Sequence, residues 1–259
     1  MAAKKALIFI ALYGITGFIF WSLFFLTPTE LNNFPILRLF IITCASILLT
    51  KYFTYMLVAP WHGVMIAAQK FARKDPLVSI LIPAYNEGMG VLGTVKTILQ
   101  SEYKHIEIIV VNDGSTDNSD KLMQEFLSER KVGAPVSMGR IQVRYFYKEN
   151  GGKGSALNFG IEKAKGDIIM TIDADCVLTP ATVGNFVRAF DNPKVMAAVG
   201  NVKIANTETM VGVVQYLEFL FSFYFKKAES VLGMIYIIGG AAGAFRREVF
   251  NTVGVFDHT

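Results

Sequence analysis

Two aspartates separated by one residue follow directly after an apolar run. Asp173 and Asp175 come after Ile168–Ile172, a run that is typical of a buried strand. Side chains alternate along an extended backbone, so the two carboxylates share a face and can converge on one hard cation just past the strand. Carboxylate oxygens suit Mg²⁺ or Mn²⁺, and such an ion can hold a diphosphate. The alternative interpretation is a solvated pair of turn residues.

Two further segments carry polar side chains beside apolar runs. Asp113 precedes the turn Gly114–Asp117, where a carboxylate can accept a hydrogen bond from a nucleobase or a ribose hydroxyl, or simply cap the turn. The glycine-rich segment Asn150–Asn158 leads into a predicted helix start that favours anions, and Lys153 adds a positive charge. Its spacing differs from GxxxxGK[ST], which argues against a nucleoside triphosphatase. The alternative there is a flexible loop with a solvated lysine.

The elements that must position these residues alternate between strands and helices from Leu77 onward. The pattern predicts strands over 77–82, 106–111, 141–147, 167–172 and 195–199, and helices over 87–100, 117–130, 153–164 and 179–190. Such alternation predicts an α/β domain with a mainly parallel sheet flanked by helices. Ligands bind at the carboxyl ends of such strands, and the polar segments all fall there. We therefore expect one shared site.

Composition narrows the class of protein. Hydrophobic residues make up 53% of the 259 residues and charged residues 18%, and the apolar excess is concentrated in the first sixty or so positions. The formal net charge of +4, without an arginine-rich face or zinc-ligand spacing, argues against a nucleic-acid partner. Cys44 and Cys176 have no CxxC partner, which argues against a disulfide framework.

The apolar excess lies in two long runs. Ala6–Leu26 has no charged side chain, and Ile36–Val58 contains only Lys51. Because about 20 apolar residues span a bilayer, residues 1–60 are predicted to form a transmembrane hairpin. Residues 61–75 are then a juxtamembrane linker, and basic residues beside the hairpin predict a cytosolic domain over 76–259. The alternative is a buried helical hairpin in a soluble protein.

Taken in order, the motifs resemble those of family 2 inverting glycosyltransferases with the GT-A fold. Within that family, the chain looks like the processive membrane synthases of poly-N-acetylglucosamine, chitin, hyaluronan and cellulose. The resemblance covers roughly Pro76 to the end of the chain. The matching segments are Ile80–Glu87, Val111–Asp117, Gly152–Asn158, Asp173–Asp175 and Gly239–Arg247.

The resemblance implies a function and a role for each site residue. A sugar, expected to be N-acetylglucosamine, would pass from a UDP-sugar donor to a growing polysaccharide with inversion, at the inner cell membrane. The implied roles are Pro83, Ala84, Tyr85 and Glu87 framing the uridine, Asp113 contacting uracil, Lys153 near the nucleotide, Asp173 holding the ribose or sugar, and Asp175 ligating Mg²⁺ or Mn²⁺. In the same family, a segment such as 207–232 lies under the membrane as an interfacial helix, the alternative being a core helix.

One departure from the family concerns the acceptor. The family carries a Thr-Glu-Asp motif whose aspartate is the general base, followed by Gln-x-x-Arg-Trp, and neither occurs before Thr259. The base is therefore expected beyond this chain, which is interpreted as C-terminally truncated and of doubtful transfer activity by itself. Two alternatives to processive synthesis are transfer to a lipid acceptor and a non-catalytic membrane protein that binds the donor.

Overall fold

The computed structural model describes residues 14, 17–19, 21–22, 33–67, 75–129, 136–138, 141–205, 207–239 and 241–257. The chain divides into two compact units, one formed by residues 1–69 and 203–235 and the other by residues 70–202 and 236–259. The second unit contains the predicted site.

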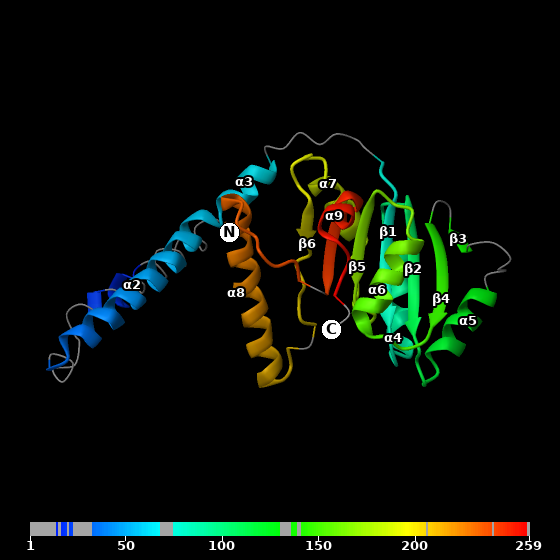
Figure 1. The fold of residues 1–259 in the computed structure, drawn as a ribbon, viewed down its shortest axis with the longest axis horizontal. Helices are drawn as coiled ribbons and strands as arrows, with labels where there is room; N and C mark the ends of the chain where they lie inside the picture. The colour runs from blue at the N-terminus through cyan, green and yellow to red at the C-terminus, as the bar shows by residue number, and fades with distance from the viewer. Residues whose placement is uncertain are drawn as a thin grey trace. The chain divides into compact units, whose positions relative to one another are not determined.

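The second unit is built on a seven-stranded sheet with the order β3-β4-β2-β1-β5-β7-β6 (Figure 1). The strands are β1 (Val78–Ala84), β2 (Ile106–Asp113), β3 (Val136–Met138), β4 (Ile141–Lys148), β5 (Ile168–Ile172), β6 (Ala197–Val199) and β7 (Ala242–Arg246). Strands β4, β2, β1 and β5 are mutually parallel, whereas β3 and β7 run antiparallel to their neighbours. The predicted mainly parallel α/β sheet is confirmed.

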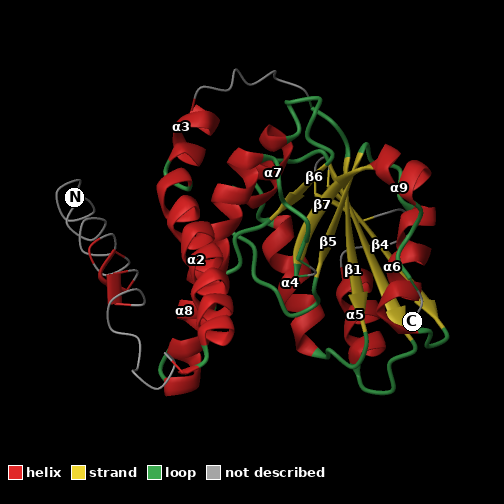
Figure 2. Cartoon of the chain, turned by 60° about the vertical axis from the view of Figure 1, so that its left-hand side comes forward, coloured by secondary structure: helices red, strands yellow, loops and turns green. Residues whose placement is uncertain are grey.

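Helices cover both faces of this sheet because its central strands are apolar on both sides (Figure 2). Ile80 and Ile82 of β1 pack in one core with α4 (Met89–Leu99), α5 (Ser119–Glu129) and α7 (Thr182–Ala189). Leu81, between them, packs in a second core with α6 (Gly152–Lys163) and α9 (Arg247–Val253). The alternation of side chains along a strand assigns successive residues to opposite cores.

A buried polar cluster lies toward the amino ends of the strands. The Glu107 carboxylate accepts hydrogen bonds from the Ser79 hydroxyl at 2.6 Å, from the Lys165 backbone amide and from the Arg144 guanidinium at 3.2 Å. The Ser79 hydroxyl oxygen in turn accepts the Gly166 amide at 2.7 Å. We call Ser79, Glu107 and Arg144 the amino-edge cluster. It joins β1, β2, β4 and the start of β5.

Two strands differ from the sequence prediction. β7 pairs between β5 and β6, although no strand was predicted over 242–246, and β3 adds a short antiparallel edge beside β4. The segment Ala242–Arg246 contains no β-branched residue, so local propensity does not mark it. Its pairing to Ile168–Ile172 is formed across about seventy residues of chain, which short-range patterns cannot report.

The first unit is helical. It contains α2 (Pro35–Val58), α3 (Trp61–Ala67) and α8 (Met210–Leu232). Tyr55, Ala59 and Ala228 form its buried core, and the Tyr224 hydroxyl donates to the Met56 carbonyl at 3.0 Å. Thr209 caps α8 by accepting the Gly212 amide, and Gly233 ends it in the left-handed conformation.

One helical stretch in the described part, Pro35–Ile66, is long and apolar enough to cross a membrane by length and composition. The other predicted span, Ala6–Leu26, falls mostly outside the described residues, so the two-helix hairpin stays a prediction. Within the predicted linker, Trp61–Ala67 is helical.

Candidate functional site

The acidic pair lies on a tight turn directly after β5. The Cys176 amide donates to the Asp173 carbonyl at 3.2 Å, which closes the turn around Asp175. The Asp175 side chain is exposed, whereas Asp173 forms an ion pair with Lys153 at 2.5 Å between Nζ and Oδ1. Lys153 comes from the first turn of α6, so the structure joins two of the sequence-predicted segments at the carboxyl edge of the sheet.

Asp113, at the end of β2, is buried and already engaged. Its carboxylate accepts the Gly152 amide at 2.7 Å, the Gly151 amide at 3.1 Å and the Lys148 ammonium at 2.5 Å. The helix start that was predicted to favour an anion therefore holds the chain's own carboxylate. At Gly114, φ is +73°, and an added β carbon would lie 2.7 Å from the Asn150 amide nitrogen, so this close approach requires glycine.

The loops after β1 and β2 are tied together by Asn86. Its side-chain oxygen accepts the Thr116 amide at 2.8 Å and the Asp117 amide at 3.3 Å, and its own amide donates to the Ser115 hydroxyl at 3.0 Å. Asn86 has φ of 56°, in a left-handed region where asparagine is one of the few tolerated residues. Sequence reasoning did not single out this residue.

The other predicted donor-binding residues occupy the end of β1 and the loop that follows. Ala84 is buried and Pro83 is half-buried, so these two residues support the loop and are less open to a ligand than the residues that follow. Tyr85, with 49% of its surface exposed, and the exposed Glu87 are available to a ligand. Asn86 thus fixes the backbone of a loop on which the neighbouring Tyr85 and Glu87 side chains are exposed.

A hydrogen-bonded chain supports the turn after β2 and was also not predicted. The Asn112 amide donates to the Tyr145 hydroxyl at 2.7 Å, and that hydroxyl donates to Asp120 at 2.6 Å. The Asn112 oxygen accepts the Ser115 amide at 2.8 Å. Burial, with the Asp120 hydrogen bond, raises the pKa of Tyr145, so this phenol stays protonated and remains a donor at neutral pH.

The donor set at the acidic turn fits Mg²⁺ or Mn²⁺ that a bound diphosphate shares. Asp173 and Asp175 offer carboxylate oxygens, but the described residues contain no group of three His, Cys, Asp or Glu side chains placed to hold a metal. Two carboxylates suit an ion whose other ligands are phosphate oxygens and water. Burial, then the Asp175 and Asp173 charges, raise the pKa of the neighbouring Cys176 thiol.

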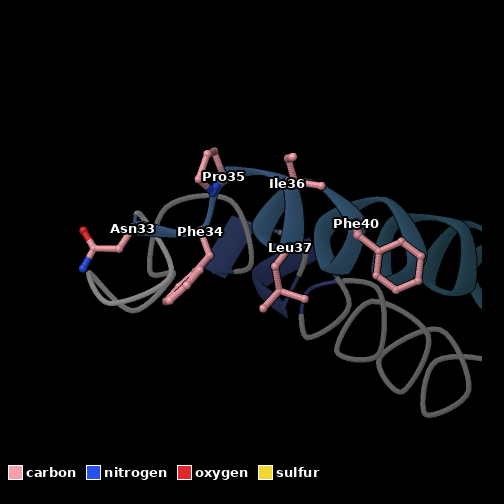
Figure 3. A pocket seen from close by; sticks show the side chains of 6 residues that line it. All are labelled: Asn33, Phe34, Pro35, Ile36, Leu37 and Phe40. Atoms are coloured by element: carbon pink, nitrogen blue, oxygen red, sulfur yellow. The ribbon is translucent and has the colours of Figure 1, made fainter.

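An apolar hollow of about 510 Å³ lies at the start of α2, in the first unit (Figure 3). Its lining residues are Asn33, Phe34, Pro35, Ile36, Leu37 and Phe40. They include one polar side chain and no charge, so this hollow lacks the groups that would bind a nucleotide.

Curated relatives are similar to a large part of this chain. A poly-beta-1,6-N-acetyl-D-glucosamine synthase of Staphylococcus epidermidis is 29% identical over 208 residues, which cover 80% of this chain and 48% of the relative. The synthase of the same description from Staphylococcus aureus strain COL is 29% identical over 182 residues, covering 70% and 42%. The chain thus spans about half the length of the curated relatives it matches.

A solved structure supports the fold assignment. A mannosyltransferase from Pyrobaculum calidifontis, in complex with GDP-Man and Mn²⁺, superposes with a TM-score of 0.57 at 21% identity, covering 83% of this chain and 58% of that one. The family model described as glycosyl transferase family 2 matches residues 79–254, which include strands β2 to β7 and every predicted site residue. The chain therefore belongs to glycosyl transferase family 2.

Proposed function

We propose that this chain carries the donor-binding half of a membrane glycosyltransferase that transfers N-acetylglucosamine from UDP-N-acetylglucosamine to a growing polysaccharide, with inversion. The observation that carries the proposal is the ion pair between Lys153 and Asp173, 2.5 Å long, beside the exposed Asp175 at the carboxyl edge of the sheet. The similarity to poly-beta-1,6-N-acetyl-D-glucosamine synthases supports the choice of sugar and product.

In this proposal, different residues bind different parts of the UDP-sugar donor. Tyr85 and Glu87 frame the uridine on a loop that Asn86 fixes, with Pro83 and Ala84 beneath it. Asp113 orders Gly151 and Gly152 through their amides and so sets the position of Lys153. A direct contact between Asp113 and uracil requires one of its present hydrogen bonds to exchange for the base.

At the acidic turn, Asp173 contacts the ribose or sugar and Asp175 holds Mg²⁺ or Mn²⁺ on the diphosphate. When bound, such an ion would offset the negative charge that develops on the departing UDP. Lys153 is placed to exchange its partner Asp173 for a diphosphate oxygen, because both groups are partly exposed, at 53% and 30%. These residues act on the donor. Activation of the acceptor hydroxyl requires a base that none of them supplies.

The first unit is proposed to attach the enzyme to the inner cell membrane, with the sheet domain in the cytosol. Helix α2 exposes large apolar side chains such as Ile36, at 84%, and Phe40, at 65%, which lipid would cover. Helix α8 exposes Met210 and Phe221, and its buried residues within the described part are Gly212, Ala228 and Glu229. This pattern favours an interfacial helix over a core helix.

The test is UDP binding by calorimetry to the purified full chain in detergent, with and without Mn²⁺. We expect Mn²⁺ to strengthen UDP binding in the wild type. Asp175→Asn should lower the UDP affinity measured in Mn²⁺ by about tenfold or more. Glu125→Gln, at an exposed position of α5, is the matched loss of a carboxylate and should leave UDP binding and its Mn²⁺ dependence unchanged. Unchanged Mn²⁺ dependence in Asp175→Asn would remove the metal assignment, and absence of UDP binding would remove the function.

A further inference from the structure

A buried hydroxyl lies beneath the acidic turn. Thr94, on α4, is 1% exposed, and its side-chain oxygen lies 2.7 Å from the Ala174 carbonyl and 2.8 Å from the Cys176 carbonyl. Its own helix offers the Gly90 carbonyl at 3.3 Å, a longer contact. These two carbonyls belong to the residues immediately before and after Asp175. The hydroxyl therefore holds the backbone on both sides of the proposed metal ligand.

The hydroxyl has one proton for two close acceptors, so it shares the proton or alternates between them. Either way, a buried carbonyl of the turn loses its donor if the hydroxyl is removed, because α4 covers this side of the turn. Among the hydrogen bonds found in the described part of the chain, none involves the Asp175 carboxylate. The backbone therefore sets the position and direction of the Cα–Cβ bond of Asp175, and the Thr94 hydroxyl on α4 holds that backbone.

A second position on α4 reinforces this packing. Gly90, one helical turn before Thr94, faces the same turn: a β carbon added there would lie 3.4 Å from the Ala174 carbonyl oxygen and 3.9 Å from the Asp175 α carbon. Residues four apart on a helix share a face. Both distances are ordinary van der Waals separations, so they show that the face of α4 carrying Gly90 and Thr94 packs directly against the acidic turn.

We propose that Thr94 is a positioning residue for the metal site, because its hydroxyl holds the Ala174 and Cys176 carbonyls and thereby the backbone from which the Asp175 side chain extends. This inference rests on the proposed function, in which Asp175 holds a divalent cation with the donor diphosphate. In this proposal, Thr94 contacts neither the metal ion nor UDP. Loss of its hydroxyl should therefore reduce the contribution of the metal to UDP binding and leave the nucleotide contacts of the other loops intact.

The experiment compares Thr94→Val, Thr94→Ser and Thr97→Val in the full chain in detergent. UDP affinity is measured by calorimetry with Mn²⁺ and with EDTA, and folding is followed by thermal unfolding. Thr97→Val is the matched control, because Thr97 lies one turn further along α4 and its hydroxyl accepts the Leu178 amide at 3.2 Å, beyond the acidic turn.

We expect Thr94→Val to weaken UDP binding about tenfold in Mn²⁺ and to leave binding in EDTA unchanged, the size expected for losing one buried hydrogen bond. Thr94→Ser, which keeps the hydroxyl, should restore the Mn²⁺ effect, and Thr97→Val should resemble the wild type. If Thr94→Val does not fold, Thr94→Ala, which lets water reach the carbonyls, should show the same direction with a smaller loss.

Three results would overturn the inference: wild-type Mn²⁺ dependence in the variants without the hydroxyl, equal weakening in Mn²⁺ and in EDTA, or an equal effect of Thr97→Val. The last two would show that α4 only stabilises the fold. Failure of the proposed function is a separate result, because it would appear in the wild type as UDP binding that is absent or indifferent to Mn²⁺.

Discussion

The two ends of the parallel strands carry charged groups in opposite environments. Toward the amino ends, Glu107 is 3% exposed and pairs with Arg144 as part of the amino-edge cluster. At the carboxyl ends, Asp173 and Lys153 are 30% and 53% exposed and have few competing partners. A buried, fully bonded carboxylate holds strands together, whereas a half-exposed pair remains free to exchange partners with a ligand.

Asp113 combines features of both edges of the sheet. It lies at the carboxyl edge, where ligand binding is proposed, yet it is as buried as Glu107 and accepts three groups from the loop 148–152. Proximity to the site is therefore a weaker guide to ligand contact than exposure and free hydrogen-bonding capacity. Asp175, Tyr85 and Glu87 meet the first of these criteria, because all three are exposed.

The largest expected effect on stability is at the amino-edge cluster. Glu107→Ala removes the acceptor of three donors and leaves Arg144 without its carboxylate, so the free energy of unfolding should fall by about 3 kcal/mol. Denaturant titration followed by circular dichroism measures this change. UDP affinity of the folded fraction should stay at the wild-type value. A loss below about 1 kcal/mol would mean that the cluster is not structurally important.

Loss of a carboxylate at the carboxyl edge should affect UDP affinity more than stability. Asp173→Asn is expected to alter the free energy of unfolding by less than about 1 kcal/mol, because the Lys153 pair is solvated. UDP affinity in Mn²⁺ should nevertheless fall about tenfold, or about 1.4 kcal/mol. Calorimetry beside denaturant titration gives both values. If Asp173→Asn destabilises the fold as much as Glu107→Ala, the two edges of the sheet do not differ in the way described.

Asn86 provides an intermediate test, since its role combines backbone conformation with hydrogen bonding. Asn86→Gly keeps the left-handed conformation but loses the bonds to the Thr116 and Asp117 amides, and should lower stability by about 1 kcal/mol. Asn86→Ala adds the strain of a β carbon at φ of 56°, roughly 1 kcal/mol more. Equal stabilities of the two variants by thermal unfolding would contradict the conformational part of this account.

The smallest expected effect is pH-dependent and comes from Asp117. Hydrogen bonds from the hydroxyl and amide of Ser119 lower the pKa of this exposed carboxyl below its ordinary value of 3.8. A lowered folded-state pKa contributes stability that is present above pH 3.8 and is lost as pH falls through the folded value. The difference in thermal midpoint between wild type and Asp117→Asn should therefore be constant near neutral pH and shrink below pH 3.8. A difference that persists in acid would contradict this origin.

The positions of the strands, and of the motifs at their ends, could be predicted because both depend on local sequence. Ile106–Val111 and Ile168–Ile172 are continuous apolar runs, and parallel strands buried on both faces have this composition. The insertion of β7 between β5 and β6 could not be predicted, since Ala242–Arg246 has little local strand preference and gains its conformation from its two neighbours.

Residue type and local pattern are enough to place two aspartates after β5, an aspartate at the end of β2 and a lysine at the start of α6. The partners of these side chains follow from tertiary packing. Asp113 bonds to a lysine and two amides 35 to 39 positions away, and Thr94 reaches the acidic turn across 80 positions. Hydrogen bonds of this range depend on where packing brings two segments together, so residue type and spacing alone cannot distinguish a carboxylate that orders a loop from one left open to a ligand.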